Sequence, residues 1–150
     1  EASMSTSIRE HVGITISRTA RTWRTKLDER LSPLGLTQAR WLVLMHLSRM
    51  GGESLQKELA FIVGVEGPTL VRVLDGLERI GLVQRLGVEG DKRARLIRLT
   101  PQADSVISDI MRIGIKLRGE ALAGISDEDL ESFFRVLEAI LANLAVAPSE

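Results

Sequence analysis

The spacing of apolar residues along the chain predicts a mainly helical protein with one small β-hairpin. Apolar side chains recur every three or four positions in most segments, which is the period of an amphipathic helix. They alternate with polar side chains only over 82–86 and 95–100, which predicts two short strands joined by a loop over 87–94. The predicted helices span about residues 7–31, 37–49, 55–63, 66–80, 101–123 and 126–144.

Short polar residues and helix breakers mark the ends of these segments. Ser32-Pro33 ends the first helix, and glycines close the next three. We expect Thr37 and Ser54 to cap the second and third helices, and Thr100-Pro101 to cap the fifth. Ser126, followed three positions later by Asp129, has the spacing of a capping box for the sixth helix.

Residues 55–80 form two short helices around a glycine-containing turn, which is the helix-turn-helix pattern. The apolar stripe of the second helix ends at Ile80 and is expected to face the core, which leaves Thr69 and Arg72 facing outward. An α-helix fits the major groove of DNA, and residues near its N-terminus reach the base edges. The pattern therefore suggests a nucleic-acid-binding lobe.

The loop between the two predicted strands contains glycine and is basic. Gly87 and Gly90 are expected to turn the chain, and the run Lys92-Arg93-Ala94-Arg95 follows them. Cations on a rigid β-finger can contact phosphates, and the negative potential of a narrow minor groove attracts arginine. Asp91 is interpreted as an internal partner for the loop backbone or for a nearby arginine.

The distribution of charge supports a basic face, although the net charge of the 150-residue chain is zero. Residues 79–98 carry six basic and two acidic side chains, whereas residues 100–150 carry four basic and nine acidic ones. Within the basic segment, Arg85 and Arg98 are expected to face solvent or to lie near phosphates. Zero net charge therefore does not exclude nucleic acid as a partner.

Composition argues against several other classes of function. The chain has no cysteine, which excludes thiol chemistry and disulfides and fits a reducing, cytoplasmic location. His11 and His46 lie far apart with no acidic cluster around them, so no metal or cofactor is expected. There is no glycine-rich phosphate loop and no Ser-His-Asp candidate, so we do not expect an enzyme.

No apolar run is long enough to predict a membrane span, and the first residues are polar, so we expect neither a membrane anchor nor a secretory leader. Met4 is interpreted as the native start, preceded by three residues left by cloning.

Three stretches carry a resemblance to a known family. "LTQARW", "VGVEGPTLVRVLDGLERIGLVQR" and "GDKRARLIRLTPQA" are similar to segments of the MarR family of winged-helix transcriptional regulators, most closely its SlyA branch. The similarity covers about residues 8–145. The resemblance implies a homodimer that binds a pseudo-palindromic operator in double-stranded DNA, with one winged helix on each half-site.

The resemblance also places the family's DNA contacts on the second helix of the helix-turn-helix and on the wing. Pro68, Thr69 and Arg72 fall where the recognition helix touches DNA, and Asp91-Lys92-Arg93 matches the Asp-x-Arg signature of the wing. Gly67 stands where a longer polar residue is common in the family. The expected DNA-binding residues are Gly67, Pro68, Thr69, Arg72, Arg85, Lys92, Arg93 and Arg95, with Gly87, Gly90 and Asp91 shaping the wing.

Many members of the family bind small aromatic or phenolic anions between the dimer arm and the DNA-binding lobe. Two arginines near a tryptophan would suit such a ligand, because they pair with a carboxylate while the ring makes apolar contact. The residues in the segments that line this crevice are Arg21, Trp23, Arg24, Ala39, Trp41 and Met45. For the two tryptophans, packing in the core or in an interface is the alternative interpretation.

The chain ends are expected to form the dimer interface. Residues 1–32 and 101–147 are predicted to be dimerisation helices, and residues 37–100 to be the winged helix-turn-helix lobe of a single chain, 1–150. Packing within the chain's own core is the alternative for the apolar seam of the last helix. A dimer interface is favoured, because a terminal helix with apolar residues on two sides lacks enough partners in one small lobe. The predicted interface residues are Ile8, Val12, Leu130, Phe134, Leu137, Leu141 and Leu144.

Two other classes of function share these features. A winged-helix module that binds proteins keeps the fold without the basic face, and a ligand carrier would use the crevice alone. The basic wing tip together with Arg72 favours a homodimeric, sequence-specific DNA-binding transcriptional regulator. The resemblance implies that a small aromatic or phenolic effector modulates it. Repressor is the expected role, with activator as the open alternative.

Overall fold

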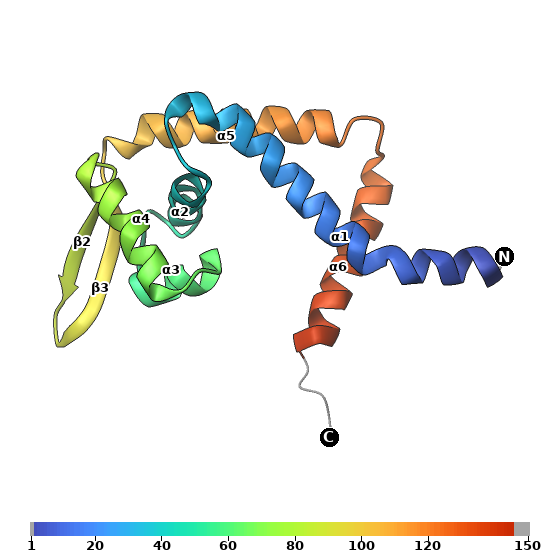
Figure 1. Ribbon diagram of the computed structural model, residues 1–150, viewed down its shortest axis with the longest axis horizontal. Coiled ribbons are helices and arrows are strands. Elements are labelled where there is room, and N and C mark those ends of the chain that lie inside the picture. Colours follow the sequence, from blue (N-terminus) through green and yellow to red (C-terminus); the bar gives the residue numbers. More distant parts are fainter. Residues whose placement is uncertain (1, 146–150) are drawn as a thin grey trace, which may run out of the picture. The chain divides into compact units, whose positions relative to one another are not determined.

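A computed structural model describes the backbone of residues 2–145 and the side chains of residues 4–145. It comprises two compact units, Glu1–Leu117 and Arg118–Glu150, and confirms a mainly helical chain with a small antiparallel sheet (Figure 1). The elements are α1 (Ala2–Leu31), the 3₁₀ helix η1 (Ser32–Leu34), α2 (Gln38–Arg49), β1 (Glu53–Leu55), α3 (Gln56–Val63), α4 (Gly67–Arg79), β2 (Val83–Val88), β3 (Asp91–Leu99), α5 (Ala103–Ala121) and α6 (Asp127–Ala145).

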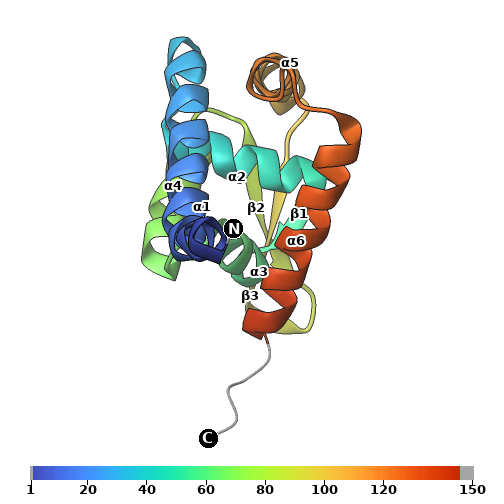
Figure 2. The same cartoon turned by 90° about the vertical axis from the view of Figure 1, so that its right-hand side faces the viewer.

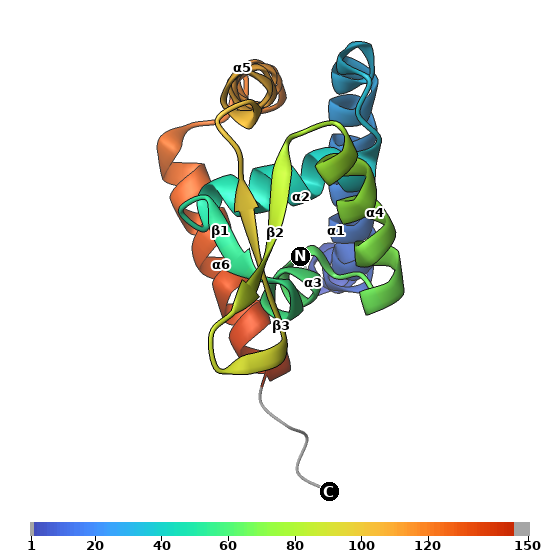
Figure 3. The ribbon, with the colours of Figure 1, turned by 90° about the vertical axis from the view of Figure 1, so that its left-hand side faces the viewer.

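The sheet has three strands in the order β1-β3-β2, and both neighbouring pairs are antiparallel (Figure 3). The prediction of Ser54 as a helix cap was wrong, because Ser54 is buried in β1 and pairs with Ile97 of β3. Helix α3 begins at Gln56 instead. A three-residue strand is too short to show the alternation by which strands are predicted from sequence.

The core of the first unit lies where α2, α3 and α4 pack against one another and against the sheet. Leu59 is the buried residue of α3, whereas Ile62 on the same helix is 44% exposed and Leu55, at the end of β1, is 36% exposed. Ile80 is 49% exposed because α4 ends at Arg79. The largest fully buried side chains are Trp41, Leu31, Leu44, Leu47, Leu59, Leu70, Leu74, Leu77, Ile97, Val43 and Val83.

The helix caps agree with the sequence in two of the remaining cases. The hydroxyl of Thr37 accepts a hydrogen bond from the backbone N–H of Arg40, and that of Ser126 accepts one from Asp129. Thr100 does something else, because its hydroxyl donates to the carbonyl of Gly81 at 2.5 Å and α5 begins only at Ala103. This hydrogen bond ties the end of α4 to the base of the hairpin.

Two helices carry apolar residues that their own unit does not cover. The first half of α1 is exposed, and Ile8 and Ile14 are 61% and 69% accessible. Figure 2 labels both helices, α1 and α6. Helix α6 has no buried residue within its described range, Asp127–Ala145. Residues 146 and 147, the end of the predicted arm, lie outside the described residues.

Candidate nucleic-acid interface

Helix α4 presents one apolar face to the core and one polar face to solvent. Leu70, Leu74 and Leu77 are buried at the expected spacing, and Pro68 sits in the first turn, where a missing N–H costs nothing. Arg72 lies one turn beyond Pro68 and is exposed, and its side chain has no hydrogen bond or ion pair within the described part of the chain. The N-terminal half of α4 therefore offers an accessible edge with an uncompensated cation.

The hairpin is longer and its turn tighter than the sequence suggested. Strand β2 continues to Val88 and β3 begins at Asp91, so only Glu89 and Gly90 form the turn, rather than a loop over 87–94. Gly90 has φ of 83°, in the left-handed region that favours glycine. Gly87 was expected to help turn the chain, but it lies within β2 and pairs with Arg95.

A bulge in β3 displays the basic residues of the wing, β2–β3. One step along β2, from Gly87 to Val88, corresponds to four along β3, from Arg95 to Asp91. The residues between them, Lys92-Arg93-Ala94, have no partner in β2. Such a bulge leaves backbone groups that need other hydrogen-bond partners.

Two side chains of the hairpin satisfy those backbone groups. The carboxylate of Asp91 accepts a hydrogen bond from the backbone N–H of Arg93 at 3.0 Å, which is the contact with the loop backbone expected from sequence. The guanidinium of Arg95 donates to the carbonyls of Lys92 and Ala94 at 3.1 and 2.9 Å. Arg95 thus shapes the bulge, while the side chain of Arg93 makes no hydrogen bond or ion pair with any described residue.

An open groove of about 600 Å³ lies between the start of α3, the start of α4 and the wing, and we call it the α4–wing groove. Among the predicted DNA-binding residues, Gly67, Arg93 and Arg95 line it; Thr69 and Arg72 do not. Gln56 and Lys57 were not predicted as site residues, because their helix carries no local signal for a surface role. The lining residues are Leu55, Gln56, Lys57, Ala60, Gly67, Leu70, Asp91, Arg93, Ala94 and Arg95.

Arg85 occupies a different place from the one expected. Its guanidinium contacts Asp75 at 2.6 Å and Glu78 at 3.0 Å, both on α4, and its side chain is only 24% exposed. The hydrogen bond from Arg85 lowers the pKa of Glu78, and the same bond raises the pKa of Arg85. Arg85 is therefore an internal partner of α4 rather than a free cation on the wing. The three-residue spacing of Asp75 and Glu78 was the signal in the sequence, because it puts both acids on one side of the helix.

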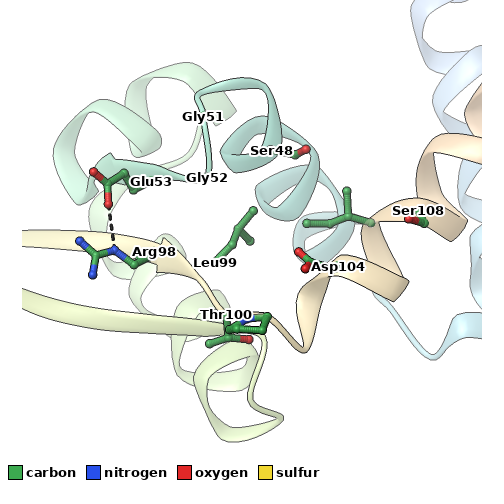
Figure 4. A pocket seen from close by; sticks show the side chains of 11 residues that line it. Ser48, Gly51, Gly52, Glu53, Arg98, Leu99, Thr100, Asp104 and Ser108 are labelled. Carbon is green, nitrogen blue, oxygen red and sulfur yellow. Dashed lines mark hydrogen bonds and ion pairs between the residues drawn. The ribbon is translucent and has the colours of Figure 1, made fainter.

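Arg98 is likewise paired, at the base of the wing. It contacts Glu53, the residue opposite it in β1, at 2.8 Å. Both side chains line a second open cavity of about 650 Å³ that also borders α2 and the start of α5 (Figure 4). Leu99, Asp104 and Ser108 line this cavity as well, and it contains none of the predicted effector-binding residues.

The residues expected to bind an effector are on α1 and α2, with one correction. Trp41 is 1% exposed and its indole N–H donates to Asp28 at 3.2 Å, so it is a core residue without a surface for a ligand. Arg21 and Arg24 are exposed. The remaining three, Trp23, Ala39 and Met45, are partly buried.

His46, on the same helix as Trp41, has a pKa below its usual range. Burial is the largest cause, and the cations Arg49 and Arg24 add to it. The ring is therefore neutral at physiological pH. Among the side chains that the structure describes, no group of His, Asp or Glu could hold a metal ion, and no described helix is long and apolar enough to cross a membrane.

The short helix pair α3–α4, packed on a three-stranded sheet whose β2–β3 hairpin follows it in the chain, defines a winged helix-turn-helix protein. Comparison with known proteins identifies the family within this class. A model of the MarR family matches residues 34–94. A crystal structure named transcriptional regulator PA3341 is 54% identical, with a TM-score of 0.82 over 88% of this chain and 96% of that one. This chain therefore belongs to the MarR family of transcriptional regulators.

Two more solved structures are similar over most of their length. A MarR family transcriptional regulator from Silicibacter pomeroyi is 26% identical, with a TM-score of 0.79 over 95% of both chains. A mutant MarR from E. coli, complexed with operator DNA, is 27% identical, with a TM-score of 0.76 over 89% of this chain and 97% of that one.

Proposed function

We propose that this transcriptional regulator acts as a homodimer that binds an operator in double-stranded DNA through α4 and the wing. The observation that carries the proposal is the set of uncompensated cations at the start of α3, on the exposed face of α4 and at the wing tip. Arg72, Arg93 and Lys57 are exposed and have no ion-pair partner among the described residues. Lys92 stands beside Arg93 in the bulge and is equally exposed.

Two other arginines of the wing differ from these cations, because they are paired with acids. Arg85 and Arg98 are neutralised by carboxylates of the chain itself, whereas the tip and the start of α4 keep their charge. Uncompensated cations next to an exposed helix N-terminus suit a polyanion, because each phosphate contact releases bound counterions. Pro68, Thr69 and Arg72 are then the candidates for contacts with bases, and Arg93 is the candidate for the minor groove.

The homodimer is supported by the apolar faces of α1 and α6. Phe134, Leu141 and Leu144 are 61%, 67% and 78% exposed, and Ile8 and Val12 are exposed on α1. Exposed apolar side chains repeated at helical spacing favour burial against another subunit. Two copies would carry two recognition helices, as a pseudo-palindromic operator requires, with the half-sites about 34–36 Å apart.

The proposal also agrees with the comparisons. The similar E. coli protein was crystallised with operator DNA. Within the family we place the chain in the SlyA-like branch, on the sequence of its wing and of residues 63–100. In the cytoplasm such a dimer would act as a repressor where its operator overlaps a promoter, since bound protein then blocks access to that DNA.

We further propose that a small aromatic anion modulates DNA binding. The exposed Arg21 and Arg24 supply positive charge near the partly buried Trp23, and Ala39 and Met45 offer apolar surface on α2. A ligand that binds one arrangement of the dimer better than another shifts the DNA affinity by that difference. Trp41 is not part of this site, because it is buried.

Binding to the DNA upstream of the protein's own gene, measured by gel shift at two salt concentrations, tests the proposal. We expect a discrete complex that weakens steeply with salt. No complex at either concentration would favour the protein-interaction module instead. Thermal shift with aromatic carboxylates tests the effector, and an unchanged melting temperature across such a series would count against it.

A further inference from the structure

A charged cluster joins α4 to the wing. Strand β2 is the edge strand of the sheet, and α4 packs beside it. Arg85 of β2 contacts Asp75 and Glu78 with its guanidinium, and its backbone N–H donates to the Glu78 carboxylate at 3.2 Å. One residue of the wing is thus held to α4 through both its side chain and its main chain.

Beyond this cluster, the chain connects α4 to β2 through a short turn. Gly81 has φ of 80° there, and its carbonyl accepts the hydrogen bond from the Thr100 hydroxyl. With a rise of 1.5 Å per residue, Asp75 lies about 9 Å along the helix from Gly81, and Gly67 lies about 21 Å from it. A rotation about the turn therefore moves the N-terminal end of α4 roughly twice as far as it moves the cluster.

We propose that Arg85 is a positioning residue whose ion pairs with Asp75 and Glu78 set the separation between the start of α4 and Arg93 at the wing tip. This inference rests on the proposed function, in which these two regions contact DNA together. Contact groups must be held within about 0.5 Å of their productive geometry, so a looser cluster weakens DNA binding although it touches no DNA.

One double variant distinguishes a positioning role of Arg85 from direct contact with DNA, because the two roles predict opposite changes in operator affinity. The double variant Asp75→Asn, Glu78→Gln removes two negative charges from the lobe and leaves Arg85 in place. If Arg85 contacted phosphate, its release from the acids would strengthen DNA binding and steepen the salt dependence. Positioning by the cluster predicts the opposite, operator affinity about threefold to tenfold weaker, in the range of coupling between contacting residues.

Two further variants complete the test, with operator affinity measured by fluorescence anisotropy and folding checked by circular dichroism. Glu89→Gln is the matched control, because Glu89 is an exposed acid at the wing tip without an ion pair in the described chain; its loss should leave binding equal or tighter. Arg85→Glu should weaken binding, and adding Glu78→Arg should restore it to within about threefold, since the pair is rebuilt with reversed charge.

The outcomes distinguish this inference from the proposed function. Wild-type protein that binds no operator DNA would overturn both. If the wild-type protein binds operator DNA but the Asp75→Asn, Glu78→Gln variant binds it more tightly, only the positioning role is overturned. Failure of the reversed pair to recover any affinity lost in Arg85→Glu would overturn it equally.

Discussion

The exposed side chains of the α4–wing groove and those of α6 differ in kind. Around the groove the exposed side chains include the cations Lys57 and Arg93, and the apolar residues Leu70 and Ala94 lie beneath them, buried or partly buried. On α6 the exposed residues include Phe134, Leu141 and Leu144, and no described residue of that helix is buried. A polyanion explains the first surface and an apolar partner explains the second. The two surfaces therefore fit the two partners proposed above, DNA and a second copy of the chain.

Breaking the apolar surface should have the largest effect. Leu141→Asp places a charge in the proposed dimer seam, so we expect monomers at micromolar concentration by analytical ultracentrifugation. Operator affinity should fall by at least about 100-fold, because two linked half-sites bind far more tightly than one. Glu138→Gln on the same helix is the control and should remain dimeric. A variant that is still dimeric with unchanged affinity would place the interface elsewhere.

The next effect concerns the exposed polar face of α4. Arg72→Ala should cost about 1–3 kcal/mol of operator binding and relax the sequence preference at one position, if the side chain contacts a base. Arg79→Ala, at the C-terminal end of the same helix, should change binding little. The affinities of both protein variants for a panel of operator sequences measure the loss of binding and the change in sequence preference. An equal loss on every sequence would assign Arg72 to phosphate.

A smaller effect is expected on stability, from the turn of the wing. Gly90→Ala forces a side chain into the left-handed region and should lower the free energy of unfolding by about 1–2 kcal/mol, measured by urea denaturation. Gly87→Ala is the control, since Gly87 lies in β2, has no positive φ, and a Cβ there would meet no atom within 4 Å. Its effect should stay within about 0.5 kcal/mol. Equal losses in the two variants would contradict the observed turn.

The smallest effect is a pH dependence at the paired base of the wing. The pKa of Glu78 is lowered in the folded protein. The ion pair therefore contributes fully to the free energy of unfolding at a pH above the pKa of Glu78 in the unfolded chain. This contribution is lost as the pH falls through the lowered pKa of the folded protein. Because the side chain is 42% exposed, we expect less than about 1 kcal/mol. Glu78→Gln should therefore be slightly less stable than wild type at pH 7, and the difference should shrink as the pH falls below 4.5 and through the lowered pKa. A difference that does not shrink with falling pH would exclude the ion pair as its cause.

The sequence predicted the helices, the hairpin and the basic tip because each has a local signal. The stripe that ends at Ile80, the cap at Thr37 and the run from Lys92 to Arg95 are all visible within a few residues. Strand β1 has no such signal, because its three residues are a strand only through their pairing with β3.

Contacts between residues far apart in the chain could also not be predicted from the sequence. Arg85 and Arg93 have the same charge and lie on the same hairpin, yet one faces two acids of α4 and the other faces none. Likewise, Trp41 has an aromatic ring suited to a ligand, but the packing of α1 and α2 buries it against Asp28. These distinctions depend on which elements become neighbours in the fold.

The salt dependence of operator binding by wild-type protein and by Arg93→Ala tests the central claim most directly. Arg93 is exposed, held at its backbone by Asp91, and free of any ion pair among the described residues. We predict weaker binding by the variant and a slope of log K against log salt that is smaller by about one unit. Equal affinities and equal slopes would contradict the assignment of the wing tip as a DNA contact.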